Sequence, residues 1–381
     1  MRLTIDDRIV EVPEGTLIAD AAAQAGIEIP VYCYHQALGP LGACRMCLVE
    51  VEKAPKLVAS CTAAVSEGMV VHTQNAKVDK GRQGVLEFLL INHPLDCPVC
   101  DKGGECFLQD YTYRYGPGRG RFGEAKLAKA KDAPLSEHIL IDQERCVLCQ
   151  RCVRFLDEYV GEKQLAFVGR GVETVVDNAG GVPLTSPFSG NVIDLCPVGA
   201  LLSTHYHDKA RPWNIDRKET VCPHCPVGCS ATLTARDNKI LRMEGRPHPG
   251  RDWGWLCDRG RFGYDMGAHP RRLLTGRIAG EETSAALASR KISELLADTV
   301  KRYGSGAVAA VIGGEYTTEE AYQIKEFLTN VVGTDRIAIS RSVPGYVPMG
   351  LNGTFEDLAQ SDVVVLIGSD PYDSVPVVHL K

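Results

Sequence analysis

Fifteen cysteines among 381 residues constrain this chain more than any other feature of its sequence. The N-terminus, Met1 to Asp7, lacks the apolar segment of a secretory signal, so we expect a cytosolic, reducing setting. In that setting cysteines are metal ligands more often than disulfides. An iron–sulfur cluster is usually held by four protein ligands, mostly thiolates, and fifteen does not divide by four. If the cysteines hold clusters, one ligand is expected from another type of residue.

The stretch from Asn92 to Cys106 supplies a candidate, because a histidine precedes three closely spaced cysteines with the pattern H-x3-C-x2-C-x5-C. We predict that one [4Fe-4S] cluster is held by His93, Cys97, Cys100 and Cys106. The other twelve cysteines then divide along the sequence into three sets of four. A neutral imidazole in place of a thiolate is expected to raise the reduction potential, as histidine does in Rieske centres. The alternative is a surface His-Pro turn after a helix that ends near Asn92.

Residues 1–78 are predicted to form a small β-rich domain. Apolar residues flank the turn signal Asp6-Asp7, which predicts a hairpin. We expect Thr16 to cap a helix that runs to Ala25, with Gly26 at its C′ position. A strand is expected at 48–51.

The cysteines of this region have the spacing C-x10-C-x2-C-x13-C, and they are Cys33, Cys44, Cys47 and Cys61. The small residues Gly42 and Ala43 are expected to let backbone amides approach sulfur. Hairpin, helix and cysteine loop resemble a β-grasp ferredoxin with a [2Fe-2S] cluster, although plant-type ferredoxins open with C-x4-C. A structural zinc site remains the alternative, but zinc sites favour two close cysteine pairs.

Two further sets predict [4Fe-4S] clusters. The first has a C-x2-C-x2-C core followed, 44 residues later, by a Cys-Pro pair: Cys146, Cys149, Cys152 and Cys196. The second has the spacing C-x2-C-x3-C-x27-C and resembles the cluster that opens molybdopterin-dependent oxidoreductases: Cys222, Cys225, Cys229 and Cys257. Three arginines near the first core either offset cluster charge or form a solvated basic face: Arg145, Arg151 and Arg154.

The remaining segments carry no cysteine. The Gly-, Arg- and Lys-rich stretch after Gly116 is interpreted as a solvated linker. Between 276 and 381, we expect a helix at 281–303, a buried strand at 307–314, a helix capped by Thr317 that runs to Val332, and a buried parallel strand at 362–368. Alternation of strands and helices predicts an α/β unit.

The order and spacing of the cysteine sets, together with His93, resemble those of the large iron–sulfur subunit (the G subunit) of bacterial NADH:quinone oxidoreductase, respiratory complex I. The motifs that carry the resemblance are Gly42 to Val49, His93 to Pro98, and Cys225 to Cys229. It covers essentially the whole chain, but the C-terminal domain of this family is usually much longer. We therefore expect the chain to be part of a longer family member.

The resemblance implies an α+β multidomain architecture. Its expected segments are a β-grasp 2Fe-2S ferredoxin-type domain at 1–78, a 4Fe-4S domain with one histidine and three cysteine ligands at 79–118, a linker at 119–137, a ferredoxin-like 4Fe-4S domain at 138–210, a 4Fe-4S domain of the molybdopterin-oxidoreductase type at 215–271, and a partial molybdopterin-oxidoreductase-like α/β domain at 276–381.

The resemblance also implies one [2Fe-2S] and three [4Fe-4S] clusters, no molybdenum cofactor, and no catalytic residue in this chain. Electrons from NADH and FMN in a partner flavoprotein would pass through the clusters toward quinone, coupled to proton translocation. The implied partners are that flavoprotein, a small 2Fe-2S subunit and other peripheral-arm subunits, with the membrane arm contacted indirectly. The implied location is peripheral, on the cytoplasmic side of the cell inner membrane. A net charge of −6 argues against a nucleic-acid partner.

Three other classes of protein share parts of this pattern. The catalytic subunit of an NAD-linked molybdenum formate dehydrogenase usually offers a C-x-K-G segment and a later metal-binding cysteine. Here Cys257 is followed by Asp258-Arg259-Gly260, and no cysteine comes after it. The diaphorase subunit of an NAD-reducing hydrogenase is expected to end before Cys222. A zinc-bound scaffold would be colourless, whereas iron–sulfur clusters absorb visible light.

Overall fold

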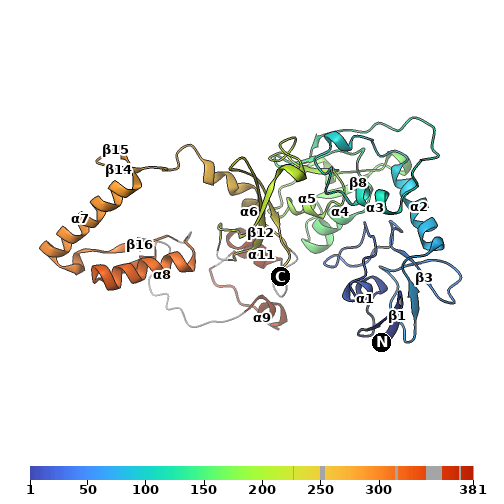
Figure 1. Cartoon of the computed structure of the whole chain (residues 1–381), viewed down its shortest axis with the longest axis horizontal. Coiled ribbons are helices and arrows are strands. Elements are labelled where there is room, and N and C mark those ends of the chain that lie inside the picture. Colours follow the sequence, from blue (N-terminus) through green and yellow to red (C-terminus); the bar gives the residue numbers. More distant parts are fainter. Residues whose placement is uncertain (226, 249–253, 314–315, 340–353, 369, 381) are drawn as a thin grey trace.

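The structure is a computed structural model, and it describes residues 1–225, 227–248, 254–313, 316–339, 354–368 and 370–380. Figure 1 shows an N-terminal domain in blue, a central body in cyan to yellow, and an orange segment with two long helices that reaches away from that body. The C-terminus returns to the central body. Pro226 and Gly314, which belong to predicted elements, lie outside the described residues.

The N-terminal domain is a five-stranded sheet with one short helix. Its strands are β1 (Arg2–Ile5), β2 (Arg8–Glu11), β3 (Leu48–Val51), β4 (Val58–Ala59) and β5 (Val70–His72), in the order β2-β1-β5-β3-β4. β1 and β5 are parallel, and the other pairs are antiparallel. Asp6 and Asp7 both have positive φ, as a tight hairpin turn requires, so the predicted hairpin is confirmed.

The helix of this domain, α1 (Ile18–Gln24), buries Ile18 against the sheet residues Leu3, Ile5 and Val71. Gly26 follows its end with φ of 70°, so its predicted C′ position is confirmed. The predicted cap is wrong. Leu17 is the N-cap, because the Thr16 hydroxyl instead donates a hydrogen bond to the Pro13 carbonyl at 2.8 Å.

Two helices follow, α2 (Ala76–Leu90) and α3 (Phe107–Tyr115), with a short 3₁₀ turn at Cys97–Val99 between them. The Asn75 side chain begins α2 by accepting hydrogen bonds from the amides of Lys77 and Val78. α2 ends at Leu90, as the sequence predicted, so that His93 lies in the turn just beyond it.

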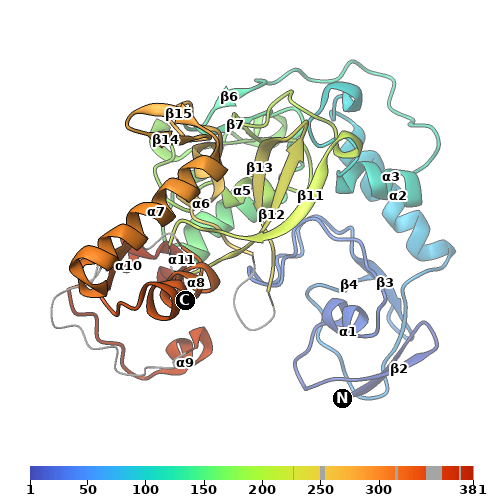
Figure 2. The same cartoon turned by 60° about the vertical axis from the view of Figure 1, so that its left-hand side comes forward.

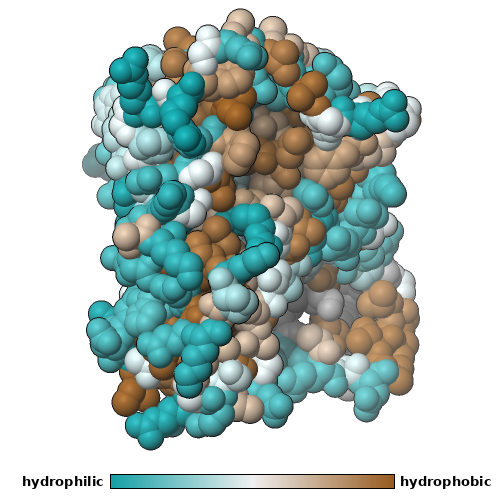
Figure 3. All heavy atoms as spheres, turned by 90° about the vertical axis from the view of Figure 1, so that its right-hand side faces the viewer, coloured by the Kyte–Doolittle hydropathy of each residue, from teal (hydrophilic) through white to brown (hydrophobic). Residues whose placement is uncertain are grey.

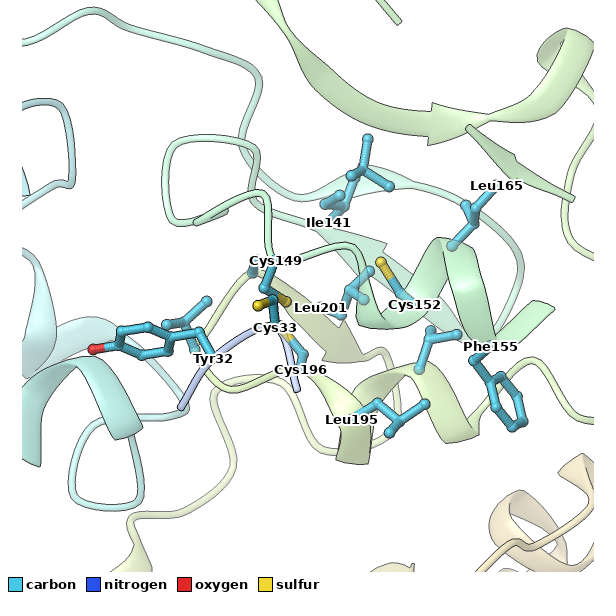
Figure 4. Packing of buried hydrophobic residues seen from close by; sticks show 14 of the residues in the cluster. Tyr32, Cys33, Ile141, Cys149, Cys152, Phe155, Leu165, Leu195, Cys196 and Leu201 are labelled. Carbon is cyan, nitrogen blue, oxygen red and sulfur yellow. The ribbon is translucent and has the colours of Figure 1, made fainter. Parts of the chain in front are cut away.

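The middle of the chain combines small antiparallel sheets with short helices. β7 (Ile139–Ile141) lies between β10 (Leu201–Ser203) and β6 (Ala133–Pro134), and β8 (Leu165–Val168) pairs with β9 (Val175–Asn178). α4 (Arg151–Arg154) continues as a π-helical turn at Phe155–Tyr159, and α5 (Asn191–Leu195) precedes Cys196. These elements enclose the largest hydrophobic core, part of which Figure 4 shows.

A third antiparallel sheet has the order β11-β12-β13 and precedes α6 (Asp258–Phe262). β12 (Ser230–Arg236) and β13 (Lys239–Gly245) turn at Asp237 and Asn238, both with positive φ. β11 (Asp216–Val221) was not predicted. Its first four residues, Asp216 to Glu219, are all charged, so the segment has no apolar face that would predict a strand.

The last segment begins with the hairpin β14 (Gly276–Ile278) and β15 (Glu281–Thr283), followed by α7 (Ala285–Tyr303). β16 (Ala310–Ile312) pairs in parallel with β17 (Ile337–Ile339). Between them α8 (Thr318–Phe327) continues as a π-helical turn at Leu328–Val332. Thr317 and Glu320 form a complete capping box, so the predicted cap is confirmed. The shorter helices that follow are α9 (Phe355–Gln360), α10 (Pro371–Ser374) and α11 (Pro376–His379). Figure 2 shows α10 and α11 beside the central body.

Three predictions for this segment need correction. Among the described residues, the buried strand expected at 307–314 is formed only at 310–312, and its Val311 is 71% exposed. The helix expected from Glu281 begins only at Ala285, because 281–283 pairs as a strand. The buried strand expected at 362–368 is not formed: Val363 to Ile367 has no strand partner among the described residues, and its side chains are 50–86% exposed. A parallel strand is stable only when neighbours pair with its backbone and both of its faces are covered.

On the face shown in Figure 3, hydrophilic side chains are interspersed with separate hydrophobic patches. Across the part of the chain that the structure describes, no helix combines the length and apolarity needed to cross a bilayer.

The central core supplies a stability prediction. Phe155 is fully buried and its ring lies 4.8 Å from that of Trp255. Replacing Phe155 by alanine leaves a cavity, so we expect the free energy of unfolding to fall by about 3–5 kcal/mol. Denaturant unfolding followed by tryptophan fluorescence measures this. Phe88→Ala is the control, since Phe88 is 79% exposed. Equal midpoints for the two variants would contradict the prediction.

Candidate iron–sulfur sites

Three thiol–thiol hydrogen bonds connect the four cysteines of the N-terminal domain. The thiols of Cys44 and Cys61 both donate to Cys33, and Cys61 also donates to Cys47. These hydrogen bonds lower the pKa of the acceptors Cys33 and Cys47 and raise the pKa of the donors Cys44 and Cys61. The deprotonated thiolate is the form that binds metal.

Backbone amides point at this group as the small residues predicted. The amide of Cys44 donates to the Sγ of Cys33 at 3.5 Å, and the Ala43 amide also donates to it. Gly42 has φ of 74°, a conformation that favours glycine. Cys33, Cys47 and Cys61 are each at most 1% exposed, whereas Cys44 is half-buried.

The second predicted set lies in the loop between α2 and α3. Burial lowers the pKa of His93 to about 4, which keeps its imidazole neutral at pH 7, as a metal ligand must be. No hydrogen bond between described residues engages the ring nitrogens of His93. Cys100 and Cys106 are buried and interact electrostatically, whereas Cys97 is exposed. A Cβ at Gly199 would lie 2.2 Å from the Cys100 Sγ, so only glycine leaves room for that thiol.

The third predicted set is brought together completely. All four thiols interact electrostatically, and they line one pocket: Cys146, Cys149, Cys152 and Cys196. Burial raises the pKa of Cys149 to about 12. Figure 4 shows Cys149, Cys152 and Cys196 beside Ile141 and Leu201.

Two residues in this loop have an unusual backbone that sequence reasoning missed. Leu148 and Gln150, on either side of Cys149, have φ of 51° and 68°. Such conformations cost on the order of 1–3 kcal/mol each in non-glycine residues, and they cluster at functional sites. Neither residue type signals a left-handed conformation, so only the structure reveals this strain.

In the fourth predicted set, the Cys222 amide donates to the Cys229 carbonyl at 2.9 Å, and the Cys222 thiol interacts electrostatically with Cys225 and Cys257. A Cβ at Gly260 would lie 2.9 Å from the Cys222 Sγ and 3.7 Å from the Cys257 Sγ. The C-terminal helix α11 covers this site, because its Val377 packs in the same hydrophobic cluster as Cys222 and Cys229.

The four groups are neighbours in one molecule. A single hydrophobic core contains at least one cysteine of each set: Cys33, Cys106, Cys149, Cys152, Cys196 and Cys257. Tyr32 interacts electrostatically with both Cys44 and Cys106, and Cys106 also interacts with Cys196. Figure 4 shows Tyr32, Cys33, Cys149 and Cys196 among the residues of this core.

The three arginines near the third set are buried, so the solvated basic face is wrong: Arg145, Arg151 and Arg154. Arg151 donates to the Tyr34 carbonyl at 2.6 Å, and Arg154 donates to the carbonyls of Leu38 and Gly39. These bonds join α4 to the loop between Cys33 and Cys44.

Arg145, which precedes Cys146, donates to the Asp96 carboxylate and so joins the third set to the loop of the second. Lys131 also donates to Asp96, at 3.3 Å. The predicted linker is therefore tied to the His93 loop at this point. Its last part is not a solvated linker, because Ala133 and Pro134 pair with β7 and Leu135 is buried.

The residues fit iron–sulfur clusters. Eleven of the fifteen cysteines are buried, and soft thiolate sulfur in a dry site suits such clusters. Glycines at 199 and 260 leave space beside the thiols that a Cβ would fill. Burial removes water, which would otherwise hydrolyse a cluster.

Four family models match successive parts of the chain. Their descriptions are a 2Fe-2S iron–sulfur cluster binding domain (residues 1–76), the iron–sulfur binding region of NADH-ubiquinone oxidoreductase-G (82–121), a ferredoxin-like domain of NADH-quinone oxidoreductase subunit 3 (136–202), and a molybdopterin oxidoreductase Fe4S4 domain (215–269). Together they indicate one 2Fe-2S domain followed by several 4Fe-4S domains.

Curated relatives match over the whole chain. The G subunit of the NADH-quinone oxidoreductase of Streptomyces coelicolor is 42% identical over 408 residues, and that of Mycobacterium tuberculosis is 39% identical over 394 residues. Subunit 3 of the Thermus thermophilus enzyme is 36% identical over 416 residues. The chain spans about half the length of these relatives, since the alignments cover 48%, 49% and 52% of them.

A solved structure, a chain of an NAD⁺-reducing [NiFe]-hydrogenase in its H₂-reduced state, is 28% identical with a TM-score of 0.50. The match covers 55% of this chain and 89% of the hydrogenase chain. The molybdenum formate dehydrogenase alternative is not favoured by these relatives. Domain order, cysteine grouping and whole-chain similarity agree, and the chain belongs to the family of NADH-quinone oxidoreductase G subunits.

Proposed function

We propose that this chain is an electron-transfer part of NADH:quinone oxidoreductase, carrying electrons from NADH and FMN in a partner subunit toward quinone, coupled to proton translocation. The observation that carries the proposal is the continuity of the four cysteine sets through one buried core. An electron carrier needs successive redox centres that are close together and shielded from water. A zinc scaffold has no such requirement.

The proposed ligands are the sixteen residues predicted from the sequence. Cys33, Cys44, Cys47 and Cys61 would hold one [2Fe-2S] cluster, and each of three [4Fe-4S] clusters would be held by one later set: His93 with Cys97, Cys100 and Cys106; Cys146, Cys149, Cys152 and Cys196; Cys222, Cys225, Cys229 and Cys257. When bound, these clusters supply one-electron redox chemistry. No molybdenum cofactor is part of the proposal.

The protein's own residues exclude water, hold the ligands and set the local charge. The buried guanidinium of Arg151 places positive charge beside Cys149 of the third set, and that of Arg145 interacts with Cys100 of the second set. Positive charge favours the reduced, more negative form of a cluster. Hydrogen bonds from backbone amides to Cys33 act in the same direction.

The proposed domain bounds are those expected from the sequence, with ligand loops at 33–61, 93–106, 146–196 and 222–257. The proposed partners are the FMN-binding flavoprotein, the small 2Fe-2S subunit and other peripheral-arm subunits. We place the chain peripherally, on the cytoplasmic side of the inner membrane, as an electron-carrying component that does not itself bind NADH.

Anaerobic iron and sulfide analysis with electron paramagnetic resonance (EPR) tests this function. We expect about fourteen irons per chain, two from a [2Fe-2S] cluster and four from each of three [4Fe-4S] clusters. The reduced protein should show signals of both cluster types. A colourless protein that contains zinc would overturn the proposal, and a molybdenum signal would favour the formate dehydrogenase alternative.

A further inference from the structure

The loop that carries Cys97, Cys100 and Cys106 is held from outside by a different part of the chain. Arg211, in the connection that leads to β11, donates from Nη1 to the Cys100 carbonyl at 2.5 Å and from Nη2 to the Pro98 carbonyl. One planar guanidinium therefore binds two carbonyls of the same loop. A guanidinium presents its donors in a fixed fork, so this pair of bonds fixes the orientation of the loop as well as its distance.

The other end of the loop is held by a second group of contacts. Glu105, which precedes Cys106, accepts two hydrogen bonds from Arg242 of β13 at 2.8 and 3.0 Å, and Arg217 of β11 also donates to it. The side chains of Glu105 and Arg242 are only 16% and 13% exposed. The Arg242 guanidinium also lies over the Tyr206 ring, with its carbon 4.3 Å from the ring centroid. A paired, bidentate and largely buried contact of this kind is geometrically specific.

The middle of the loop touches the same segment. A Cβ at Gly104, which has φ of 95°, would lie 2.9 Å from the Trp213 ring. The indole therefore packs directly on the Gly104 backbone. Three separate points of the loop, at 98–100, 104 and 105, are thus held by residues that come from 211–217 and 242.

We propose that Arg211, Trp213, Arg217 and Arg242 form a clamp that positions the ligand loop of the histidine-containing site. The inference rests on the proposed function, since it assigns the loop a cluster. In this proposal the β11–β13 sheet has two roles: it carries the cysteines of its own site, and it fixes the ligand loop of a neighbouring site. Arg211 is a positioning residue, because it acts through the backbone of Pro98 and Cys100.

The clamp has two separable effects. The carbonyl bonds restrict movement of the loop, which should slow the exchange of its backbone amides with solvent. The guanidinium also places a positive charge beside the cluster, which should favour reduction. Lysine keeps the charge but lacks the planar fork, whereas methionine keeps neither.

The experiment uses the full chain with its clusters and compares Arg211→Met and Arg211→Lys. Hydrogen–deuterium exchange read by mass spectrometry reports on amides 98–106, and EPR redox titration reports the midpoint potential of the histidine-ligated cluster. We expect Arg211→Met to speed exchange across 98–106 and to shift the midpoint to a lower value. Arg211→Lys should restore the midpoint but not the full protection of the amides.

The matched control is Arg236→Met on β12, because Arg236 pairs only with its exposed neighbour Asp237 among the residues that the structure describes. If Arg211→Met gives the same amide exchange across 98–106 and the same midpoint potential as this control, the clamp proposal is wrong. Should Arg211→Met fail to fold, the half-exposed Arg217 offers a milder change, Arg217→Gln, with the same expected increase in exchange near Glu105. An iron-free native chain would overturn the proposed function, while exchange would still decide the clamp.

Discussion

Replacement of His93 by cysteine is expected to retain its [4Fe-4S] cluster and to lower the midpoint potential by about 100–300 mV. The physical reason is charge: a thiolate adds one negative charge that the neutral imidazole does not carry, and this disfavours the reduced cluster. Burial already keeps His93 neutral, with a pKa of about 4, so protonation does not offset the change near pH 7. EPR redox titration of the full chain measures the shift.

His93→Ala and a surface substitution complete this test. Alanine offers no ligand, so the chain should lose about four irons or retain a cluster with an altered spectrum. His72→Cys is the control, because it adds a thiol at a partly exposed histidine on β5 that pairs with Glu52. An unchanged midpoint in His93→Cys, together with full iron content in His93→Ala, would exclude His93 as a ligand.

Replacement of Gly199 by alanine is expected to destroy or strongly perturb the same cluster. The added Cβ would lie 2.2 Å from the Cys100 Sγ and 3.2 Å from the Lys102 Cβ. A free thiol rotates away from such a contact at small cost, but a thiolate fixed to iron does not. We therefore expect a loss of up to about four irons per chain, with the [2Fe-2S] signal unchanged.

Gly84→Ala is the matched control for this substitution. Gly84 lies inside α2, and no atom lies within 4 Å of the position that its Cβ would take. Alanine is favoured over glycine inside a helix by about 0.5–1 kcal/mol, so this variant should be slightly stabilised and keep all its iron. Full iron and an unaltered spectrum in Gly199→Ala would show that Cys100 is not held in place.

The sequence predicted secondary structure correctly where that structure depends on residues close together in the chain. The turn at Asp6-Asp7, the strand at 48–51, the end of α2 before His93 and the capping box at Thr317 all depend on residues within a few positions of one another. The cap predicted at Thr16 failed because a competing local hydrogen bond to Pro13 was equally available. The strand predicted at 362–368 failed because burial depends on distant partners.

The candidate ligands themselves were readable from spacing and from the odd cysteine count. Their surroundings were not. Residue type does not reveal whether an arginine is solvated or buried. Only the packing of α4 against the loop at 34–39 shows that three arginines are buried: Arg145, Arg151 and Arg154. The residue types of Leu148 and Gln150 likewise do not predict their strained backbone conformation.

The sequence by itself determined the order and spacing of the cysteines, and from them it predicted four ligand sets with His93 as the sixteenth ligand, because ligand spacing is a one-dimensional property. Only the tertiary structure decided which sets are neighbours, which thiols are shielded, and which distant side chains hold each loop. Cys106 lies next to Cys196, and Arg211 holds Cys100, across about ninety and more than a hundred residues of chain. Contacts at such separations depend on how whole domains pack, and no local pattern encodes them.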